Sequence, residues 1–519
     1  MQSNKLPALL SSHLSVIPHL KRTATIGVLI SLSACTTAFN HLPTENQVTV
    51  PEKWQEATND TNHLPASVEN GWLTSFNDKE LNRYVGIALK KNPNLLDSAA
   101  QLKQAIDQVR IANASLWPSL QASGRKSRTT VEGQGLSQAN ELNTSIGVTS
   151  ETRTVRSTLD VSWELDLWGK LTQRKKSAAY SAKAQAELYK YAELSLVANV
   201  SRAWYTLVAN KLQLDLAQQR LDSFKNTASL INENYQRGIS SALDVYLSRS
   251  DVQQQISSRS TARYDYLESV RAFKVMLGEY PNSAIEFDAK LPELSAAVPT
   301  GLPAQLLTRR PDIKASQLTY QAEIASAKAA QRDLYPSINF TGAIGDSRED
   351  FSDLFVGDNL IQTFITDLTA PIFASGALRA ARNQAIYSAE SAYADLISTS
   401  LNAFEEVENS LARETSLEER KTSVTEAVAL AENGLELALD RYKLGIENYN
   451  TVLESQRRLF DSKEAEINIS NALLQNRISI HLALGGDFSG EENRDPLDSL
   501  PSLEKSTQAV TDEQGNEGK

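Results

Sequence analysis

Few side chains of this 519-residue chain are of the types that carry out catalysis or bind metal ions. There is one cysteine, and there are five histidines, of which His13 and His19 lie near the N-terminus. A single cysteine excludes an internal disulfide and a thiolate metal cluster. The other histidines are too scattered for a metal site or a Ser-His-Asp triad, and no glycine-rich phosphate loop is present. We therefore expect no catalytic residue, no metal site and no cofactor.

The surroundings of the single cysteine, Cys35, predict lipid attachment. Lys21 and Arg22 precede a short apolar stretch at 26–30, and Leu-Ser-Ala lies directly before Cys35. A basic flank, a short apolar core and small residues are typical of a secretory signal, and the stretch is shorter than the ~20 residues of a membrane-spanning helix. The tetrapeptide resembles the bacterial lipobox, in which the cysteine is acylated and becomes the mature N-terminus. The alternative is a simple signal peptide with a chance cysteine. Thr36, rather than Asp, follows Cys35, so lipoprotein sorting rules do not indicate retention in the inner membrane.

The charge balance is acidic, with 52 Lys and Arg against 63 Asp and Glu. A nucleic-acid partner is therefore not expected, because such binding needs a basic surface. Removal of residues 1–34 would take away three basic residues and no acidic residue. The acidic excess fits either a water-filled acidic interior or an ordinary solvated surface.

An internal repeat organises most of the chain. Trp117-Pro118-Ser119 matches Tyr335-Pro336-Ser337 at an offset of 218, whereas Tyr235 and Gly238 match Tyr442 and Gly445 at an offset of 207. The change in offset predicts 11 extra residues in the first copy, in a loop between 131 and 153. We divide the chain into a signal peptide (1–34), a lipid-anchored N-terminal segment (35–77), repeat 1 (78–290), a linker (291–301), repeat 2 (302–486) and a polar tail (487–519) that we expect to be disordered.

Each repeat contains a segment with the alternation of a β-strand. In residues 154–167 the odd positions are apolar and the even positions are polar, and Ile338, Phe340 and Ile344 share one face in the second repeat. We predict hairpins near 119–167 and 336–373, hence four strands per chain. The alternative is a hairpin packed on a soluble core. In an outer membrane, four strands cannot close a barrel, since the smallest barrels have about eight, and their open edges demand partners. Three chains would supply twelve strands.

Long helices flank each predicted hairpin. No Pro or Gly occurs between Lys170 and Arg237, and Val200, Leu207 and Leu221 follow a heptad series typical of coiled coils. About 67 helical residues would be roughly 100 Å long. Gly238 then breaks the helix, a second helix runs to Leu277, and the second repeat turns in the same way at Gly445. The pattern predicts long antiparallel helical hairpins. An elongated soluble coiled coil explains these helices, but not the strands or Cys35.

Several motifs resemble those of the TolC-like outer-membrane efflux proteins, specifically their OprM-like lipoprotein branch. They span nearly the whole mature chain, and the most specific are Trp163-Glu164-Leu165-Asp166-Leu167-Trp168-Gly169-Lys170 and Arg309-Arg310-Pro311-Asp312-Ile313. Further matches are Gly71-Trp72 with Phe76, Val298-Pro299-Thr300-Gly301-Leu302-Pro303, Pro371-Ile372-Phe373 and Leu484-Gly485-Gly486.

The resemblance implies a mainly α-helical chain with a membrane β-barrel portion. As a homotrimer, it would form a twelve-stranded barrel in outer-membrane lipid, joined to a periplasmic α-helical tunnel. The implied partners are a periplasmic adaptor, also called a membrane fusion protein, and an inner-membrane resistance–nodulation–division transporter. The implied function is a passive exit duct for drugs or other small molecules. A protein-secretion duct and a non-conducting, periplasm-spanning structural lipoprotein are the alternatives.

The resemblance also implies two sets of site residues. The helix tips would dock the adaptor, although their glycines could merely turn the chain. The helix after the second tip would narrow the tunnel through Asn450, Glu454 and Arg457. The family pattern has an apolar residue at the position of Asn450 and Asp at that of Glu454, so an apolar ring is in doubt but a ring of acids is kept. Glu454 and Arg457 could instead form a solvated pair on one helix. The docking residues are Tyr235, Gly238, Leu243, Asp244, Arg441, Tyr442 and Gly445.

Overall fold

The computed structural model describes residues 50–55, 71–136, 145–294, 298, 300–301, 303–353 and 360–488. The predicted signal peptide, Cys35 and residues 489–519 of the predicted tail lie outside these ranges. Asp487 and Phe488, the first residues of that tail, pack against the helical core, where the Asp487 carbonyl accepts a hydrogen bond from the Gly71 amide at 2.7 Å.

The two repeats have the same order of elements and equal helix lengths. Each contains a 22-residue helix, two strands, a 67-residue helix and a 35-residue helix. The predicted duplication is thus visible in the fold. Repeat 1 contains α4 (Pro93–Ala114), β1 (Ser119–Leu136), β2 (Ser145–Leu165), α5 (Lys170–Gln236) and α6 (Ala242–Met276). Repeat 2 contains α8 (Pro311–Arg332), β3 (Ser337–Arg348), β4 (Ile361–Thr369), α9 (Ala377–Lys443) and α10 (Tyr449–Ala483). Three short helices lie N-terminal to the 22-residue helices: α2 (Trp72–Ser75) and α3 (Lys79–Lys91) before α4, and α7 (Pro303–Arg309) before α8. A 3-10 turn at Phe351–Asp353 follows β3.

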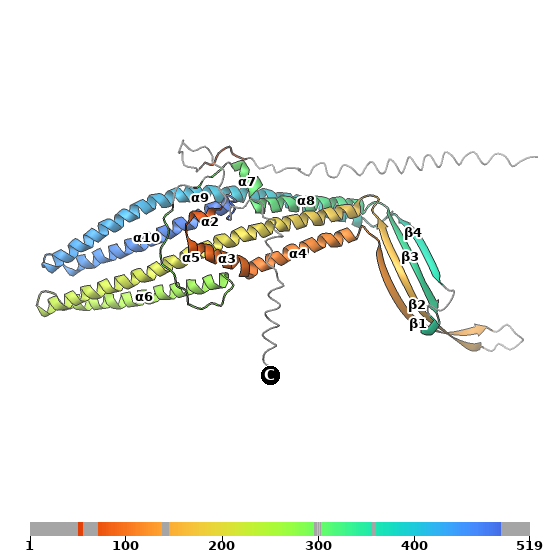
Figure 1. Cartoon of the computed structure of the whole chain (residues 1–519), viewed down its shortest axis with the longest axis horizontal. Coiled ribbons are helices and arrows are strands. Elements are labelled where there is room, and N and C mark those ends of the chain that lie inside the picture. The colour runs from red at the N-terminus through yellow and green to blue at the C-terminus, as the bar shows by residue number, and fades with distance from the viewer. Residues whose placement is uncertain are drawn as a thin grey trace, which may run out of the picture. The chain divides into compact units, whose positions relative to one another are not determined.

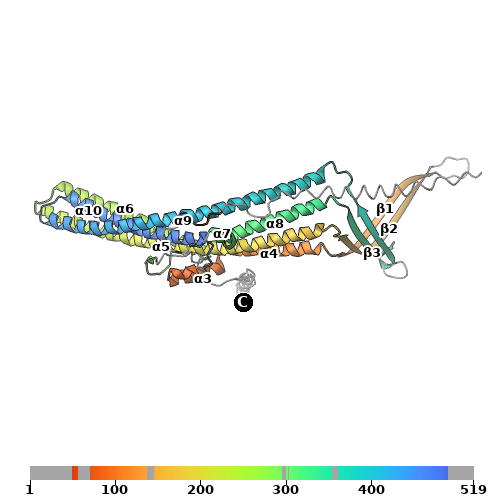
Figure 2. The ribbon, with the colours of Figure 1, turned by 90° about the horizontal axis from the view of Figure 1, so that it is seen from above.

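The long helices form two antiparallel hairpins, α5–α6 and α9–α10, that also pack on each other through α5 and α10. Figures 1 and 2 show these four helices side by side, with the strands beyond the opposite ends of α4, α5, α8 and α9. Val200, Leu207 and Leu221 of the predicted heptad series are buried. Among the described helices, none is both long enough and apolar enough to cross a membrane.

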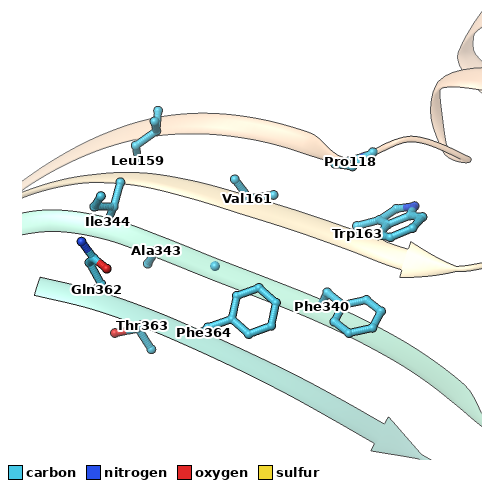
Figure 3. A pocket seen from close by; sticks show the side chains of 11 residues that line it. Pro118, Leu159, Val161, Trp163, Phe340, Ala343, Ile344, Gln362, Thr363 and Phe364 are labelled. Atoms are coloured by element: carbon cyan, nitrogen blue, oxygen red, sulfur yellow. The ribbon is translucent and has the colours of Figure 1, made fainter.

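The four strands form one antiparallel sheet in the order β1-β2-β3-β4, so β2 and β3 join the two repeats. The predicted alternation is confirmed. Figure 3 shows Leu159, Val161 and Trp163 of β2 on the same face as Phe340 and Ile344 of β3, where they line a shallow apolar hollow. The opposite face carries the polar residues of the same strands. β1 and β4 are the edges of the sheet within one chain.

The first hairpin is longer than the sequence predicted. Residues 131–136 and 145–153, which we expected in a loop, extend β1 and β2, and Leu136 pairs with Ser145. β3 ends at Arg348, opposite Val155, so the 11 extra residues lengthen the ladder beyond β3. The physical reason is continuous antiparallel pairing, since every residue from Val131 to Leu136 has a partner on β2 between Ser145 and Ser150.

The Trp163–Lys170 motif joins the sheet to the helices. β2 ends two residues earlier than predicted because the Asp166 carboxylate caps α5, where it accepts hydrogen bonds from the amides of Leu171 and Thr172 at 2.9 Å each. Trp168 reaches the other repeat, and its indole N–H donates to the Pro336 carbonyl at 2.6 Å. The motif therefore fixes the angle at which strand turns into helix.

Arg310, in the Arg309–Ile313 motif, has a structural role. This buried arginine forms ion pairs of 2.6 Å with both Asp312 and Glu406, and it donates to the Ala483 carbonyl at 3.1 Å. Its side chain thereby links the start of α8 to α9 and to the end of α10. A buried charge needs such partners, so Arg310 is a structural residue of the helical core.

Candidate functional site: the helical tips and the contact behind them

A glycine with positive φ forms each tip of the helical hairpins. Gly238 has φ 78° and follows α5, and Gly445 has φ 74° and follows α9. A Cβ atom added at either position would meet no neighbouring atom within 4 Å. The glycines are therefore required by the backbone conformation and not by lack of space, because residues with a Cβ rarely adopt this region. The predicted turns at both positions are confirmed.

Polar side chains fix the helices that leave the tips. Ser241 and Asp244 form a capping box at the start of α6, and Asn448 accepts a hydrogen bond from the Thr451 amide at the start of α10. Asp244, one of the predicted docking residues, thus has a capping role in the fold of the tip itself.

The tips carry several exposed apolar side chains. Tyr235 and Leu243, both predicted docking residues, are exposed, and so is the charged Arg441. Tyr246 is exposed as well, although its sequence neighbourhood did not indicate a role. Ile239, Leu444 and Ile446 are between 64% and 75% exposed and were not predicted as docking residues. Apolar side chains clustered on a surface in this way are typical of a protein interaction site.

Tyr442 does not have the exposed position that was expected of a docking residue. It is buried, and its hydroxyl shares a hydrogen bond of 3.0 Å with the Ser240 hydroxyl of the other tip. Its ring packs in a cluster with Ile231, Val245 and Tyr449. The expectation was wrong because α9 turns this face inward onto the neighbouring hairpin. Tyr442 therefore holds the two tips together.

Behind the tips, α10 is tied to α6 by a three-residue contact. The buried Tyr449 hydroxyl donates to the Asp251 carboxylate at 2.8 Å, and the Arg457 guanidinium donates to the other oxygen of Asp251 at 3.1 Å. Burial, and then the hydrogen bond to Asp251, raise the pKa of Tyr449. The hydroxyl therefore remains a donor at physiological pH. We call Asp251, Tyr449 and Arg457 the hairpin lock.

Glu454 and Arg457 do not pair with each other within the chain. Glu454 forms an exposed ion pair of 2.9 Å with Arg458, one turn further along α10, and Asn450 is exposed. The i,i+4 spacing brings Glu454 to Arg458, whereas Arg457 turns toward α6. The sequence analysis missed Asp251 and Tyr449. One signal was present: at the offset of 207, Tyr449, Arg457 and Arg458 match Ala242, Ser250 and Asp251, so the residue types of the two repeats differ at this contact.

Close to the hairpin lock, α10 is also joined to α5 by polar side chains. The buried Gln456 amide of α10 donates to the hydroxyls of Ser223 and Thr227 on α5, at 2.9 Å each. In the part of the chain that the structure describes, no group of three or more His, Cys, Asp or Glu side chains is placed to hold a metal ion.

Comparison with known proteins agrees with this architecture. The family model described as "Outer membrane efflux protein" matches residues 85–279 and 302–486, so the chain belongs to the outer membrane efflux protein family. The chain is 30% identical over 438 residues to the toluene efflux pump outer membrane protein TtgC of Pseudomonas putida, which covers 83% of this chain and 88% of TtgC. It is 26% identical over 471 residues to the cation efflux system protein CusC of Escherichia coli, covering 89% and 97% of the two chains.

Solved structures support the same fold. The outer membrane channel CmeC of Campylobacter jejuni superposes with a TM-score of 0.78 at 22% identity, covering 91% of this chain and 97% of CmeC. The chain is thus an outer-membrane channel that serves as the exit duct of a tripartite efflux pump, with a large helical part in the periplasm. The predicted family, the mainly helical fold with four antiparallel strands, the efflux-duct function and the outer-membrane location are confirmed.

Proposed function

We propose that three copies of this chain close a twelve-stranded barrel, through which drugs or other small molecules leave the cell without catalysis by the duct. The observation that carries the proposal is the four-stranded sheet. It has one apolar and one polar face, and its β1 and β4 edges are open within the chain. In a lipid bilayer every backbone polar group must be paired, which an open edge does not allow.

The substrates are proposed to be small molecules or ions, supplied by a pump in the inner membrane. The relatives are named for the efflux of toluene and of cations, and both cover at least 83% of this chain. A periplasmic adaptor and a resistance–nodulation–division transporter are the partners that such a duct requires. The large helical part has the length to meet an adaptor within the periplasm, since 67 residues of α5 reach roughly 100 Å.

The adaptor is proposed to dock on the tips. Tyr235, Leu243, Leu444 and Ile446 offer exposed apolar side chains there, and Arg441 offers a charge. Gly238 and Gly445 supply the turns that present these side chains. A partner that covers the patch would bury apolar area, which is the main favourable contribution to such association.

The hairpin lock is proposed to hold the periplasmic end of the duct closed at rest. Asp251, Tyr449 and Arg457 tie α6 to α10, so an outward swing of one hairpin must break their contacts. Three-fold symmetry would bring three copies of Asn450 and Glu454 toward the axis, where the acids form a ring. An adaptor that binds the tips more tightly in the open form would shift the equilibrium toward it.

Single-channel recording in planar bilayers tests the duct against its alternatives. We expect the purified protein to form pores with small resting conductance, because the lock is closed. A structural lipoprotein without a pore would give no conductance at all. A duct for folded protein would, once opened by disruption of the lock, pass polymers far larger than drugs, whereas an efflux duct would exclude them.

A further inference from the structure

Two arginines face each other on the polar side of the sheet. Arg125 of β1 pairs directly with Arg156 of β2 in the antiparallel register, and both side chains are exposed. Alternation places them on the face opposite Val161 and Leu159 of the apolar side. Like charges directly opposite each other destabilise an antiparallel pair of strands. The two arginines therefore do not stabilise the hairpin, and another role must account for them.

No acidic side chain of the described residues forms an ion pair with either arginine at the salt-bridge distance of 4.0 Å. The acids on the same face lie nearer the helical end of the sheet and have other roles. Asp160 accepts hydrogen bonds from the hydroxyls of Ser123 and Thr158, at 3.1 and 3.0 Å, and Glu164 pairs with Lys170. Asp367 lies opposite Asn339, at the same end of the sheet.

The arginines of the apolar side differ in this respect. Arg128 and Arg153 pair with Glu151 at 2.9 and 2.5 Å, and Arg348 pairs with Asp346 at 3.1 Å. Each arginine on that face therefore has a carboxylate partner in the same sheet, whereas Lys126, opposite Val155, forms no ion pair there with a described residue. Among the arginines of the described strands, only Arg125 and Arg156 lack a carboxylate partner, and both lie at one level of the polar face.

We propose that Arg125 and Arg156 form a basic belt around the inside of the barrel, which favours anions over cations at the exit. This inference rests on the proposed trimeric barrel, in which the apolar face meets lipid and the polar face lines the water-filled lumen. Three-fold symmetry would place six guanidinium groups at one level. A ring of like charges within low-dielectric walls concentrates ions of the opposite sign and repels the others. The belt thus selects negatively charged or carboxylate-bearing small molecules, and it hinders entry of cations from outside.

Reversal potentials across a potassium chloride gradient in planar bilayers test the belt. The Arg125→Gln/Arg156→Gln variant should lower the chloride-to-potassium permeability ratio by roughly twofold or more, and Arg125→Glu/Arg156→Glu should lower it further. The matched control is Arg128→Gln/Arg153→Gln, which removes the same charge from the opposite face of the same strands and should leave the ratio unchanged. Removal of the like-charge pair should not reduce the yield of assembled protein.

The possible results separate the belt from the duct. Pores of the Gln and Glu variants with the permeability ratio of the wild type overturn the belt and leave the duct intact. The proposed belt is also overturned if the control variant lowers the permeability ratio as much as the belt variants do. Ion selectivity would then not depend on which face of the sheet carries the charge. A wild-type protein that forms no pore overturns the proposed duct itself, and the belt with it.

Discussion

The buried hydroxyl of Tyr449 on α10 donates a hydrogen bond of 2.8 Å to Asp251 on α6, so that the second repeat is tied to the first one behind the tips. Arg457 adds a second donor to the same carboxylate at 3.1 Å. One turn further along α10, Asp461 forms a second charged contact between the hairpins, with Arg220 of α5 at 3.0 Å, but the lock is the one that involves a predicted gate residue, Arg457. The lock is therefore the natural place to test closure.

Loss of the lock should open the duct. Tyr449→Phe and Asp251→Asn each remove or weaken a hydrogen bond to a charged group, which contributes about 1.5–3 kcal/mol. We expect a shift of roughly tenfold or more toward the open form. Single-channel conductance and the entry of large antibiotics should rise, with trimer yield unchanged. The control is Arg458→Gln, which breaks only the exposed pair with Glu454.

Arg457→Ala should also raise conductance, whereas Glu454→Ala, which breaks only the exposed pair with Arg458, should have little effect. Normal conductance in Tyr449→Phe, Asp251→Asn and Arg457→Ala together would show that the contact is only structural. The gate would then have to be sought elsewhere on α10.

His481 should make the helical core sensitive to mild acid. Its ring stacks on Trp72 at 5.4 Å, and burial, followed by the charge of Arg477, lowers its pKa to about 4. Between about pH 6.5 and 4 the unfolded chain binds a proton that the folded chain does not. The contribution to stability is therefore complete above pH 6.5 and falls as the pH drops toward 4, by at most ~3 kcal/mol.

Thermal unfolding at pH 7.5 and pH 5 measures this contribution. His481→Phe keeps an aromatic ring against Trp72 but cannot be protonated. Its melting temperature should fall less between the two pH values than that of the wild type. The carboxylates are the same in both proteins, so they contribute equally to the change with pH. If the melting temperature falls equally in the two proteins, protonation of His481 does not cause the loss of stability.

The turn at Gly445 should be essential for efflux but not for assembly. Gly445→Val forces a β-branched residue into positive φ, which strains the tip. Drug resistance should be lost while trimers still reach the outer membrane. Gly434→Ala, within α9 just before this turn and without positive φ, is the control and should keep full resistance. Normal resistance in Gly445→Val would refute the docking role of this tip.

Acylation of Cys35 remains a prediction of the sequence. Intact-mass analysis of the mature protein should show an N-terminal Cys35 that carries lipid. Cys35→Ala should abolish lipid labelling but allow some insertion through the barrel, because a single acyl chain anchors only weakly. A free Cys35 thiol in the wild-type protein would contradict the prediction.

Local patterns predicted most of the fold. Alternation located β2 and β3, and the repeat located both tips, because the positions of Gly238 and Gly445 depend only on nearby residues. The extension of β1 to Leu136 was missed, since the offset between repeats counts extra residues but does not show whether they pair.

The hairpin lock could not be predicted in the same way. Glu454 and Arg457 share one helix, so their spacing can be measured in the sequence. Asp251 and Tyr449 are 198 residues apart and meet only because the two hairpins pack on each other through α5 and α10. The inward turn of Tyr442 depends on the same packing. Contacts between the hairpins could therefore not be predicted from the sequence. The only indication was that the residue types at the lock differ between the two repeats.

The number of chains in the assembled protein tests the central claim most directly. Four strands with open edges predict that no folded monomer is stable in detergent. Mass measurement of the detergent-solubilised protein by native mass spectrometry should give three chains per particle, at all concentrations at which it stays folded. A folded monomer or a dimer would contradict twelve-stranded closure, and with it the duct proposed here.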